Sequence, residues 1–424
     1  MPVTTMYAGN VGTCAVILGK VVTNMQRLFA AEGFHAKVKP AWYLTWATLS
    51  QTGMSFVQQG IIVMGFLFAV RYHLDFAEIG LVTTSMSLGM MASMVFMGML
   101  ADRWGPRRLL RWGAVVMAVL AALLTQIRGF DSLLGMFFLL GISLAAVPMA
   151  GTKAVFTAFQ NRARGMPMGI RQTGVPLGAA LAAMILPVLA LHEGLNAVYG
   201  LFAVELFVVG WIFSSVIEPS VKAPAAVPKV QSKLPRSLWT PATVSVLMVA
   251  GQYFLITFTL EYLHRFRHFT LSQAGFALAL AQIGGGIGRI VFGAYSDRTG
   301  ANRPRTISQI ALLAFIMVGF VVFLPQHIGF GWICLVWFLM GMGAIGWNAL
   351  SLTWAAETVL PEQAGMAMGF VGTVVFLGSA FFPPILGAVI DSTHHFRPAW
   401  GLLAGILLGA GLLAYQASKP LRLS

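Results

Sequence analysis

Apolar runs of roughly 20 residues recur along the chain from Ala41 onward and are separated by short polar stretches. A helix of about 20 apolar residues is long enough to cross the roughly 30 Å hydrocarbon core of a bilayer. The pattern predicts twelve spans, at residues 41–70, 79–101, 109–127, 132–156, 166–190, 196–217, 239–262, 272–296, 306–324, 328–354, 364–390 and 398–416. We therefore expect an all-α polytopic membrane protein.

The composition supports this reading, because 58% of the residues are hydrophobic and only 9% are charged. Soluble proteins carry about 25% charged residues. The 27 Lys and Arg exceed the 13 Asp and Glu, but they lie in short loops between apolar runs. That placement reflects membrane topology and not a basic patch for nucleic acid. The two cysteines, Cys14 and Cys334, provide no disulfide framework.

The polar stretches divide the chain into two halves of six spans each. We expect a cytoplasmic tail at 1–40, an N-terminal bundle at 41–217, a linker at 218–238, a C-terminal bundle at 239–416 and a tail at 417–424. The linker holds four prolines and the basic residues Lys222, Lys229, Lys233 and Arg236. Translation from Met25 is an alternative start that would shorten the first tail.

The positive charges predict the orientation. With both ends inside, nineteen of the Lys and Arg lie on the cytoplasmic side, and five lie outside. Cytoplasmic loops are enriched in Lys and Arg. Both termini are therefore expected in the cytoplasm, and the cluster His264-Arg-Phe-Arg-His268 is the one local exception.

A charged hinge motif occurs twice, displaced by 195 residues. The first copy contains Gly98, Asp102, Arg103, Gly105, Arg107 and Arg108, and the second contains Gly293, Asp297, Arg298, Gly300 and Arg303. The segments Gly165–Gly169 and Gly365–Gly369 also match, with an offset of 200. Such internal repeats are typical of transporters built from two similar halves.

These residues resemble the loop 2–3 signature of the major facilitator superfamily, Gly-x-x-x-Asp-Arg/Lys-x-Gly-x-Arg/Lys-Arg/Lys. The resemblance covers about residues 41–416. It implies two six-helix bundles that rock about a central site, so that the site opens alternately to each side. It also implies that Asp102 meets the start of the eleventh helix and acts as a conformational gate. The alternative is an ordinary solvated basic loop.

Two arginines lie inside predicted spans, where a charge is costly and usually lines a cavity. Arg171 and Arg289 each lie about seven residues from the cytoplasmic end of the fifth and eighth spans. By the resemblance these two helices face each other, so the pair predicts a clamp for an anion. The alternative is that both arginines extend to the inner membrane interface, or that Arg171 pairs with Glu205 and Arg289 with Asp297.

Further polar residues within the spans are candidate substrate contacts, although each could equally form a hydrogen bond between helices. They are Gln282 on the Arg289 face, Gln51 and Gln58 on one face of the first span, Gln252 in the seventh, and Asn348 in the tenth. Glu205, deep in the sixth span, is the candidate for proton coupling.

We thus predict a secondary transporter of a small anion, such as a mono- or dicarboxylate, in the bacterial inner membrane, working by proton symport or anion exchange. We expect a monomer in the lipid bilayer with no enzymatic activity, no cofactor, no metal and no nucleic-acid partner. An exporter of lipophilic cations that uses Glu205 is the alternative. A membrane sensor would carry a large extra soluble domain, which this sequence lacks.

Overall fold

The computed structural model describes residues 40–159, 165–217, 236–300, 302–325, 328–359 and 364–419, and these are almost entirely helical. The helices of the first half are α2 (Pro40–Val63), α3 (Gly65–Tyr72), α4 (Phe76–Trp104), α5 (Pro106–Leu123), η2 (Leu124–Gln126), α6 (Phe130–Leu144), α7 (Ala146–Ala158), α8 (Gly165–Gln172), α9 (Gly174–Glu193) and α10 (Leu195–Val216). Those of the second half are η3 (Arg236–Leu238), α11 (Trp239–Glu261), η4 (Tyr262–Phe266), α12 (Leu271–Arg298), α13 (Arg303–Val322), α14 (Phe330–Ile345), α15 (Asn348–Glu357), α16 (Ala364–Thr393) and α17 (Phe396–Ala417).

The predicted spans are confirmed. Eleven helical segments are long and apolar enough to cross a membrane, and α2 with α3 adds a twelfth as a pair bent by 40°. The tenth span is interrupted, since α14 ends at Ile345 and α15 begins at Asn348.

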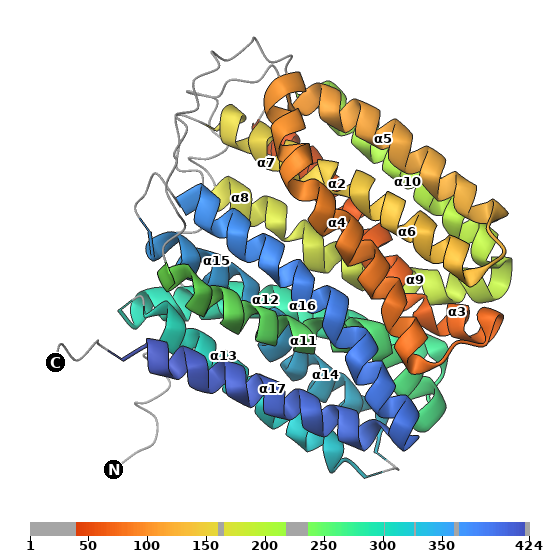
Figure 1. Ribbon diagram of the computed structural model, residues 1–424, viewed down its shortest axis with the longest axis vertical. Coiled ribbons are helices and arrows are strands. Elements are labelled where there is room, and N and C mark those ends of the chain that lie inside the picture. Colours follow the sequence, from red (N-terminus) through yellow and green to blue (C-terminus); the bar gives the residue numbers. More distant parts are fainter. Residues whose placement is uncertain are drawn as a thin grey trace, which may run out of the picture.

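Each half has its own apolar core. One cluster of buried residues includes Phe137, Phe202 and Phe213 of the first half, and another includes Phe258 and Trp337 of the second. Figure 1 shows α2–α10 together on one side of the molecule and α11–α17 on the other. Contact between the halves comes mainly from α4 packed on α16 and α9 packed on α12.

The internal repeat is visible in the packing. Gly89 of α4 lies against Phe138 of α6, and Gly284 of α12 lies against Phe338 of α14. The two glycines are 195 residues apart, and the two phenylalanines are 200 apart. In both halves a glycine therefore lets the second and fourth spans approach closely.

The hinge glycines adopt the turn that the motif predicts. Gly105 and Gly300 have φ of 81° and 83°, a region that favours glycine. Both follow the last turn of a long helix, α4 and α12 respectively. Each of these helices begins with a capping box, formed by Asp75 with Glu78 in α4 and by Thr270 with Gln273 in α12.

The halves meet tightly at one end of the molecule, which we call the sealed face. A Cβ added to Gly80 of α4 would lie 2.5 Å from Pro384 Cα of α16, and one added to Gly387 would lie 2.5 Å from the carbonyl carbon of Phe76. Such backbone contacts leave no space for a side chain, so the interface is closed there.

Polar groups cross the same interface. Thr83 and Thr257 hydroxyls are 3.2 Å apart, and the Ser379 hydroxyl donates to Ser87 at 2.9 Å. The core cluster of the second half also continues across the interface to Phe66 of the first. The seal thus combines close backbone packing, buried hydroxyl pairs and apolar contacts.

The opposite end carries both hinge motifs and is called the hinge face. Here the side of α16 that carries Gly369 and Gly372 has no described neighbour, since a Cβ added to either glycine would meet no atom within 4 Å, while Ala367 and Val371 pack inside the second half. Within the described residues, the interface is closed at the sealed face and separated towards the hinge face.

Candidate functional site

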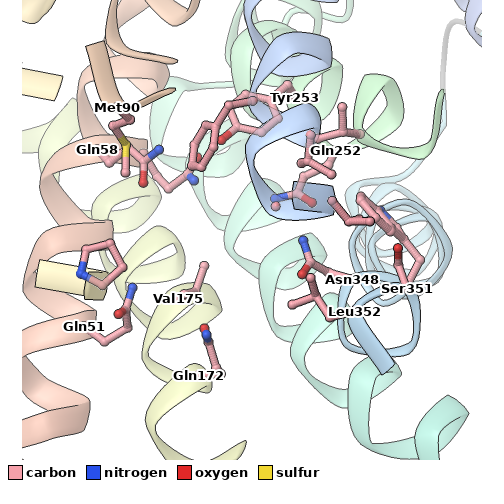
Figure 2. A pocket seen from close by; sticks show the side chains of 18 of the residues that line it. Gln51, Gln58, Met90, Gln172, Val175, Gln252, Tyr253, Asn348, Ser351 and Leu352 are labelled. Carbon is pink, nitrogen blue, oxygen red and sulfur yellow. The ribbon is translucent and has the colours of Figure 1, made fainter. Parts of the chain in front are cut away.

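A cavity of about 970 Å³, including the part that opens to solvent, lies between the two halves. It extends from Gln59 and Tyr253 beneath the seal to Leu352 and Gly372 towards the hinge face. Figure 2 shows its walls facing each other, with α2, α4, α8 and α9 on one side and α11 and α15 on the other. Its polar lining residues are Gln51, Gln58, Gln59, Gln172, Gln252, Tyr253, Arg289, Asn348 and Ser351.

The structure brings five of the seven predicted substrate contacts to this cavity. They are Arg289, Gln51, Gln58, Gln252 and Asn348. Sequence reasoning missed three further polar residues of the lining, namely Gln59, Gln172 and Ser351, and it left Tyr253 open between a cavity aromatic and an aromatic of the membrane interface. A signal for two of them existed, because Gln59 and Gln172 directly follow predicted contacts.

Arg289 of α12 is the only charged residue among the described residues of the lining. Its Nε is buried and has no hydrogen-bond partner. The alternative pairing with Asp297 does not form, because Asp297 binds Arg303 Nη1 at 2.5 Å. Arg289 therefore presents an uncompensated guanidinium group to the cavity.

Arg171 does not line the cavity, so the clamp of two arginines is not formed in this structure. Its side chain is fully buried inside the first half, where Nη2 donates to the Val147 carbonyl at 3.1 Å and Nη1 to the Thr152 hydroxyl at 3.3 Å. Gly151 leaves room for it, since a Cβ there would lie 2.9 Å from Arg171 Cζ. The alternative pairing with Glu205 is not formed in the described residues either.

The reason is the helical phase of the fifth span. Gly174 and Gly178 pack on α2, where an added Cβ at Gly174 would lie 2.9 Å from Thr52 N. Arg171 is one turn before Gly174 and shares its face, so it points into its own bundle. The next residue, Gln172, reaches the cavity.

Gln282 also lies outside the cavity lining, and its side chain is buried. Gln282 lies one helical turn nearer the sealed face than Gly286. At Gly286, α12 packs against α9. An added Cβ at Gly286 would lie 3.3 Å from Pro176 of α9. Along α12 only Arg289 lines the cavity, although Gln282 and Arg289 share a face of that helix.

Three cavity glutamines have a buried carbonyl oxygen without a hydrogen-bond partner. They are Gln51 and Gln59 of α2 and Gln252 of α11, with 4%, 3% and 6% of each residue exposed. Buried polar atoms are normally paired. Together with Arg289 Nε, these atoms mark the cavity as a site for a polar ligand.

Glu205 of α10 lies behind α2 and does not line the cavity. A Cβ added to Gly53 of α2 would collide with its carboxyl group, which is thus packed against that helix. One carboxyl oxygen, Oε2, is buried without a hydrogen-bond partner.

The second hinge motif forms an ion-pair network within the second half. Arg303 binds Asp297 at 2.5 Å and Glu357 Oε1 at 3.1 Å, joining the end of α12 to the end of α15. The neighbouring Arg298 is exposed.

In the first hinge motif Arg103 and Arg108 are exposed, and a Cβ on Gly98 would meet only the Met149 sulfur, at 3.9 Å. The side chain of Asp102 lies outside the described residues. Its predicted contact with the eleventh helix stays a prediction.

An aspartate that the sequence did not single out bridges the halves at the sealed face. Asp391, in the last turn of α16, accepts hydrogen bonds from the backbone N–H groups of Phe76 at 2.9 Å and Ala77 at 2.8 Å. These groups begin α4, where the helix dipole favours a negative charge. Asp391 therefore holds α4 to α16 across the interface.

Twelve apolar spans in two repeated halves, with the bent pair of α2 and α3 counted as one span, and a polar cavity between the halves form an integral membrane protein with a central cavity. The sequence model of the Major Facilitator Superfamily matches residues 44–383. The chain belongs to this family.

Individual relatives agree with this assignment. An uncharacterised MFS-type transporter of Mycobacterium tuberculosis is 28% identical over 340 residues, which cover 78% of this chain and 75% of the relative. A probable L-galactonate transporter of Escherichia coli is 24% identical, with 81% of each chain covered. The inward-facing, unoccupied structure of a bacterial homologue of the human lysosomal transporter Spinster superposes with a TM-score of 0.75 at 14% identity, covering 89% of this chain and 96% of that one.

Proposed function

We propose that the protein moves a small organic anion across the bacterial inner membrane, with the substrate held in the cavity between the halves and its carboxylate bound by Arg289. The substrate would reach the cavity alternately from the two faces. The observation that carries the proposal is the unpaired guanidinium group of Arg289 at the cavity wall. A buried arginine without an acid is suited to bind a carboxylate through two parallel hydrogen bonds.

The orientation follows from the loops. The sequence predicts nineteen of the 27 Lys and Arg on the same side as the two hinge motifs, so we assign the hinge face to the cytoplasm. The structure then corresponds to a conformation whose outer side is sealed and whose cavity faces inward. The inward-facing state of the Spinster homologue supports this assignment.

The relative named as a probable L-galactonate transporter supports an organic acid as cargo. The cavity itself provides the independent argument. Its described lining contains one cationic side chain and no acidic one. A carboxylate would gain a partner there, while a cation would meet like charge.

The exporter of lipophilic cations is less well supported for the same reason. Its candidate acid, Glu205, packs against Gly53 on the far side of α2 from the cavity. A cation in the cavity would thus be separated from Glu205 by a helix.

Thermal stabilisation of the purified protein tests the proposal. A panel of carboxylates should raise the melting temperature of the wild type, because a ligand that binds only the folded state stabilises it. Tetraphenylphosphonium, a lipophilic cation, should leave it unchanged. Stabilisation by tetraphenylphosphonium alone would favour the exporter.

Glu205 remains the candidate for proton coupling. An ionised carboxylate without a partner is costly in an apolar environment, so we propose that Glu205 carries a proton in this conformation and releases it in another. In the variant Glu205→Gln, accumulation driven by a pH gradient should fall at least tenfold, while exchange of internal for external substrate continues.

Parallel flux assays in proteoliposomes measure both processes. Glu193→Gln, at the end of α9, is the matched control and should keep both. Equal loss of exchange and of gradient-driven accumulation in Glu205→Gln would assign Glu205 a structural role instead.

A further inference from the structure

A second cavity lies in the second half at the sealed face. Its volume is about 990 Å³, including the part that opens to solvent, and its described lining shares no residue with that of the cavity between the halves. Its walls are η4, the end of α13 and the start of α17. The rings of Phe266 and Phe396 in this lining lie 6.3 and 5.3 Å from the ring of Phe76, at the start of α4. The second cavity is therefore beside the seal.

The second cavity collects basic side chains. Its described lining contains Arg267, His395 and Arg397 and no acidic residue. Both guanidinium groups act electrostatically on the Tyr262 hydroxyl, so they converge on one part of the cavity. Arg397 is exposed and takes part in none of the ion pairs that the described residues form. The cavity thus presents positive charge that no described acid in its lining balances.

Arg267 is held in place in the cavity wall. Its Nε donates to the Tyr262 hydroxyl at 2.9 Å, its Nη1 to the Pro325 carbonyl at 2.7 Å and its Nη2 to the Leu324 carbonyl at 3.1 Å. All three acceptors are neutral, so the charge of Arg267 stays uncompensated. A guanidinium group has five N–H donors, and two of them remain for a ligand. Because the side chain is already ordered, binding costs little side-chain entropy.

The start of α17 adds backbone donors to these side chains. Within the described residues no side chain caps this helix, and its first turn contains no acid. The first N–H groups of a helix have no partner within the helix, and its dipole favours an anion there. The N–H groups of Phe396 and Arg397 therefore add to the positive potential of the cavity.

The other walls of the second cavity are apolar. They include Phe266, Val321, Val322, Leu324 and Trp400. Phe323, between two of these residues in the chain, is 83% exposed, and Ile316 and Phe320 on the same face of α13 are exposed as well. An exposed apolar face of a spanning helix contacts acyl chains, which are as apolar as these side chains. A ligand that fits both features has an anionic group and an apolar part.

We propose that the second cavity binds the phosphate group of an anionic phospholipid, whose acyl chains lie along the exposed face of α13. Arg267, Arg397 and the first turn of α17 donate to the phosphate oxygens. Free phosphate would satisfy the arginines but would leave the apolar walls without a partner. The site also gives a role to Arg267, which belongs to the basic cluster that departs from the charge distribution of the other outer loops. Lipid binding here is independent of the cargo in the cavity between the halves.

Dissociation constants of the purified full-length protein in a non-ionic detergent test the proposal. The probes are dioctanoyl phosphatidylglycerol, which is anionic, dioctanoyl phosphatidylcholine, which has the same chains but no net charge, and inorganic phosphate. Phosphatidylglycerol should bind about tenfold or more tightly than either of the others, because only it combines a net negative charge with apolar chains. The equal chains of the two lipids control for their partition into detergent micelles.

Variants of Arg397 connect this preference to the second cavity. Because Arg397 is exposed, Arg397→Gln should fold normally and lower the affinity for phosphatidylglycerol about tenfold, through loss of a charge-assisted hydrogen bond. Its affinity for phosphatidylcholine should stay close to that of the wild type. Arg397→Lys should keep most of the affinity for phosphatidylglycerol, because the charge remains. Arg128→Gln, at an exposed arginine between η2 and α6 of the first half, is the matched control and should bind like the wild type.

Three results would overturn the lipid site. The first is equal affinity of the wild type for phosphatidylglycerol and phosphatidylcholine. The second is equal affinity of Arg397→Gln and Arg128→Gln for phosphatidylglycerol. The third is binding of inorganic phosphate as tightly as phosphatidylglycerol, which would assign the second cavity to a free oxyanion. None of these results bears on the transport of organic anions, since no transported substrate is present in the assay.

Discussion

Replacing Arg289 by Gln should lower the affinity for organic carboxylates by about 10- to 100-fold and reduce uptake accordingly. A hydrogen bond to a charged group contributes about 1.5–3 kcal/mol, and each 1.4 kcal/mol corresponds to about a factor of ten. Arg289 is the one charged group of the described cavity lining, so no neighbour there can compensate. Arg289→Lys should give an intermediate value, because an ammonium group keeps the charge but loses the planar fork.

Equilibrium binding on purified protein measures this effect directly. Arg305→Gln is the matched control, since Arg305 is exposed near the start of α13 and outside the cavity. The control should bind like wild type. If the Arg289→Gln protein folds normally and binds carboxylates with unchanged affinity, Arg289 does not bind the carboxylate of the substrate.

Asp391→Asn should open the sealed face more often. The carboxylate of Asp391 binds two backbone N–H groups at the start of α4, at 2.9 and 2.8 Å. An amide keeps one acceptor but loses the charge that the helix terminus favours. We expect a loss of about 1–2 kcal/mol, which shifts the balance between conformations by roughly 5- to 30-fold.

A cysteine reporter detects this shift. In a background without Cys14 and Cys334, Thr257→Cys places a thiol within the seal, where Thr257 is 2% exposed. Its labelling by a membrane-impermeant maleimide should become roughly 5- to 30-fold faster in Asp391→Asn. Asp131→Asn, in the first turn of α6, makes the same chemical change without a contact across the halves and should leave the rate unchanged.

Equal labelling in Asp391→Asn and Asp131→Asn would show that the Asp391 contact does not hold the seal. Slower labelling in Asp391→Asn than in the wild type would contradict this role of Asp391 more strongly. The charge of Asp391 would then favour the open state of the sealed face.

The sequence predicted the frame of this fold because the repeat reports directly on packing. The offsets of 195 and 200 residues, read from glycines and the hinge motif, recur as equivalent contacts at Gly89 and Gly284. Gly105 and Gly300 adopt the positive φ that their place in the motif requires. The length of each span follows from the thickness of the bilayer. This constraint applies to each helix separately, so the spans can be predicted without knowing which helices pack together.

The face that a membrane helix turns to its neighbours was harder to predict. Arg171 and the Gly174 strip were placed on one face, but that face packs on α2 at the glycines and on α7 at Arg171, and not on the cavity. Sequence alone gives the relative angle of two residues on a helix. It does not give the direction of that face, because both the bundle interior and the cavity accept a polar group.

Tertiary contacts between distant residues were beyond the sequence pattern. Asp391 follows an apolar span like any interfacial acid, and its partners lie about 315 residues away in the chain. The sequence left Tyr253 open between the cavity and the membrane interface, and its place in the cavity lining depends on how α11 packs between the halves. Such positions follow from the assembled interface and not from local periodicity.

Counterflow in proteoliposomes that contain the wild-type protein tests the central claim most directly. Vesicles loaded with a carboxylate that raises the melting temperature of the protein should accumulate the same labelled acid from outside, with no ATP and no imposed gradient of other ions. Labelled tetraphenylphosphonium should not exchange under the same conditions. Counterflow of the cation, with none of the carboxylates, would contradict the account of this protein as an organic-anion transporter.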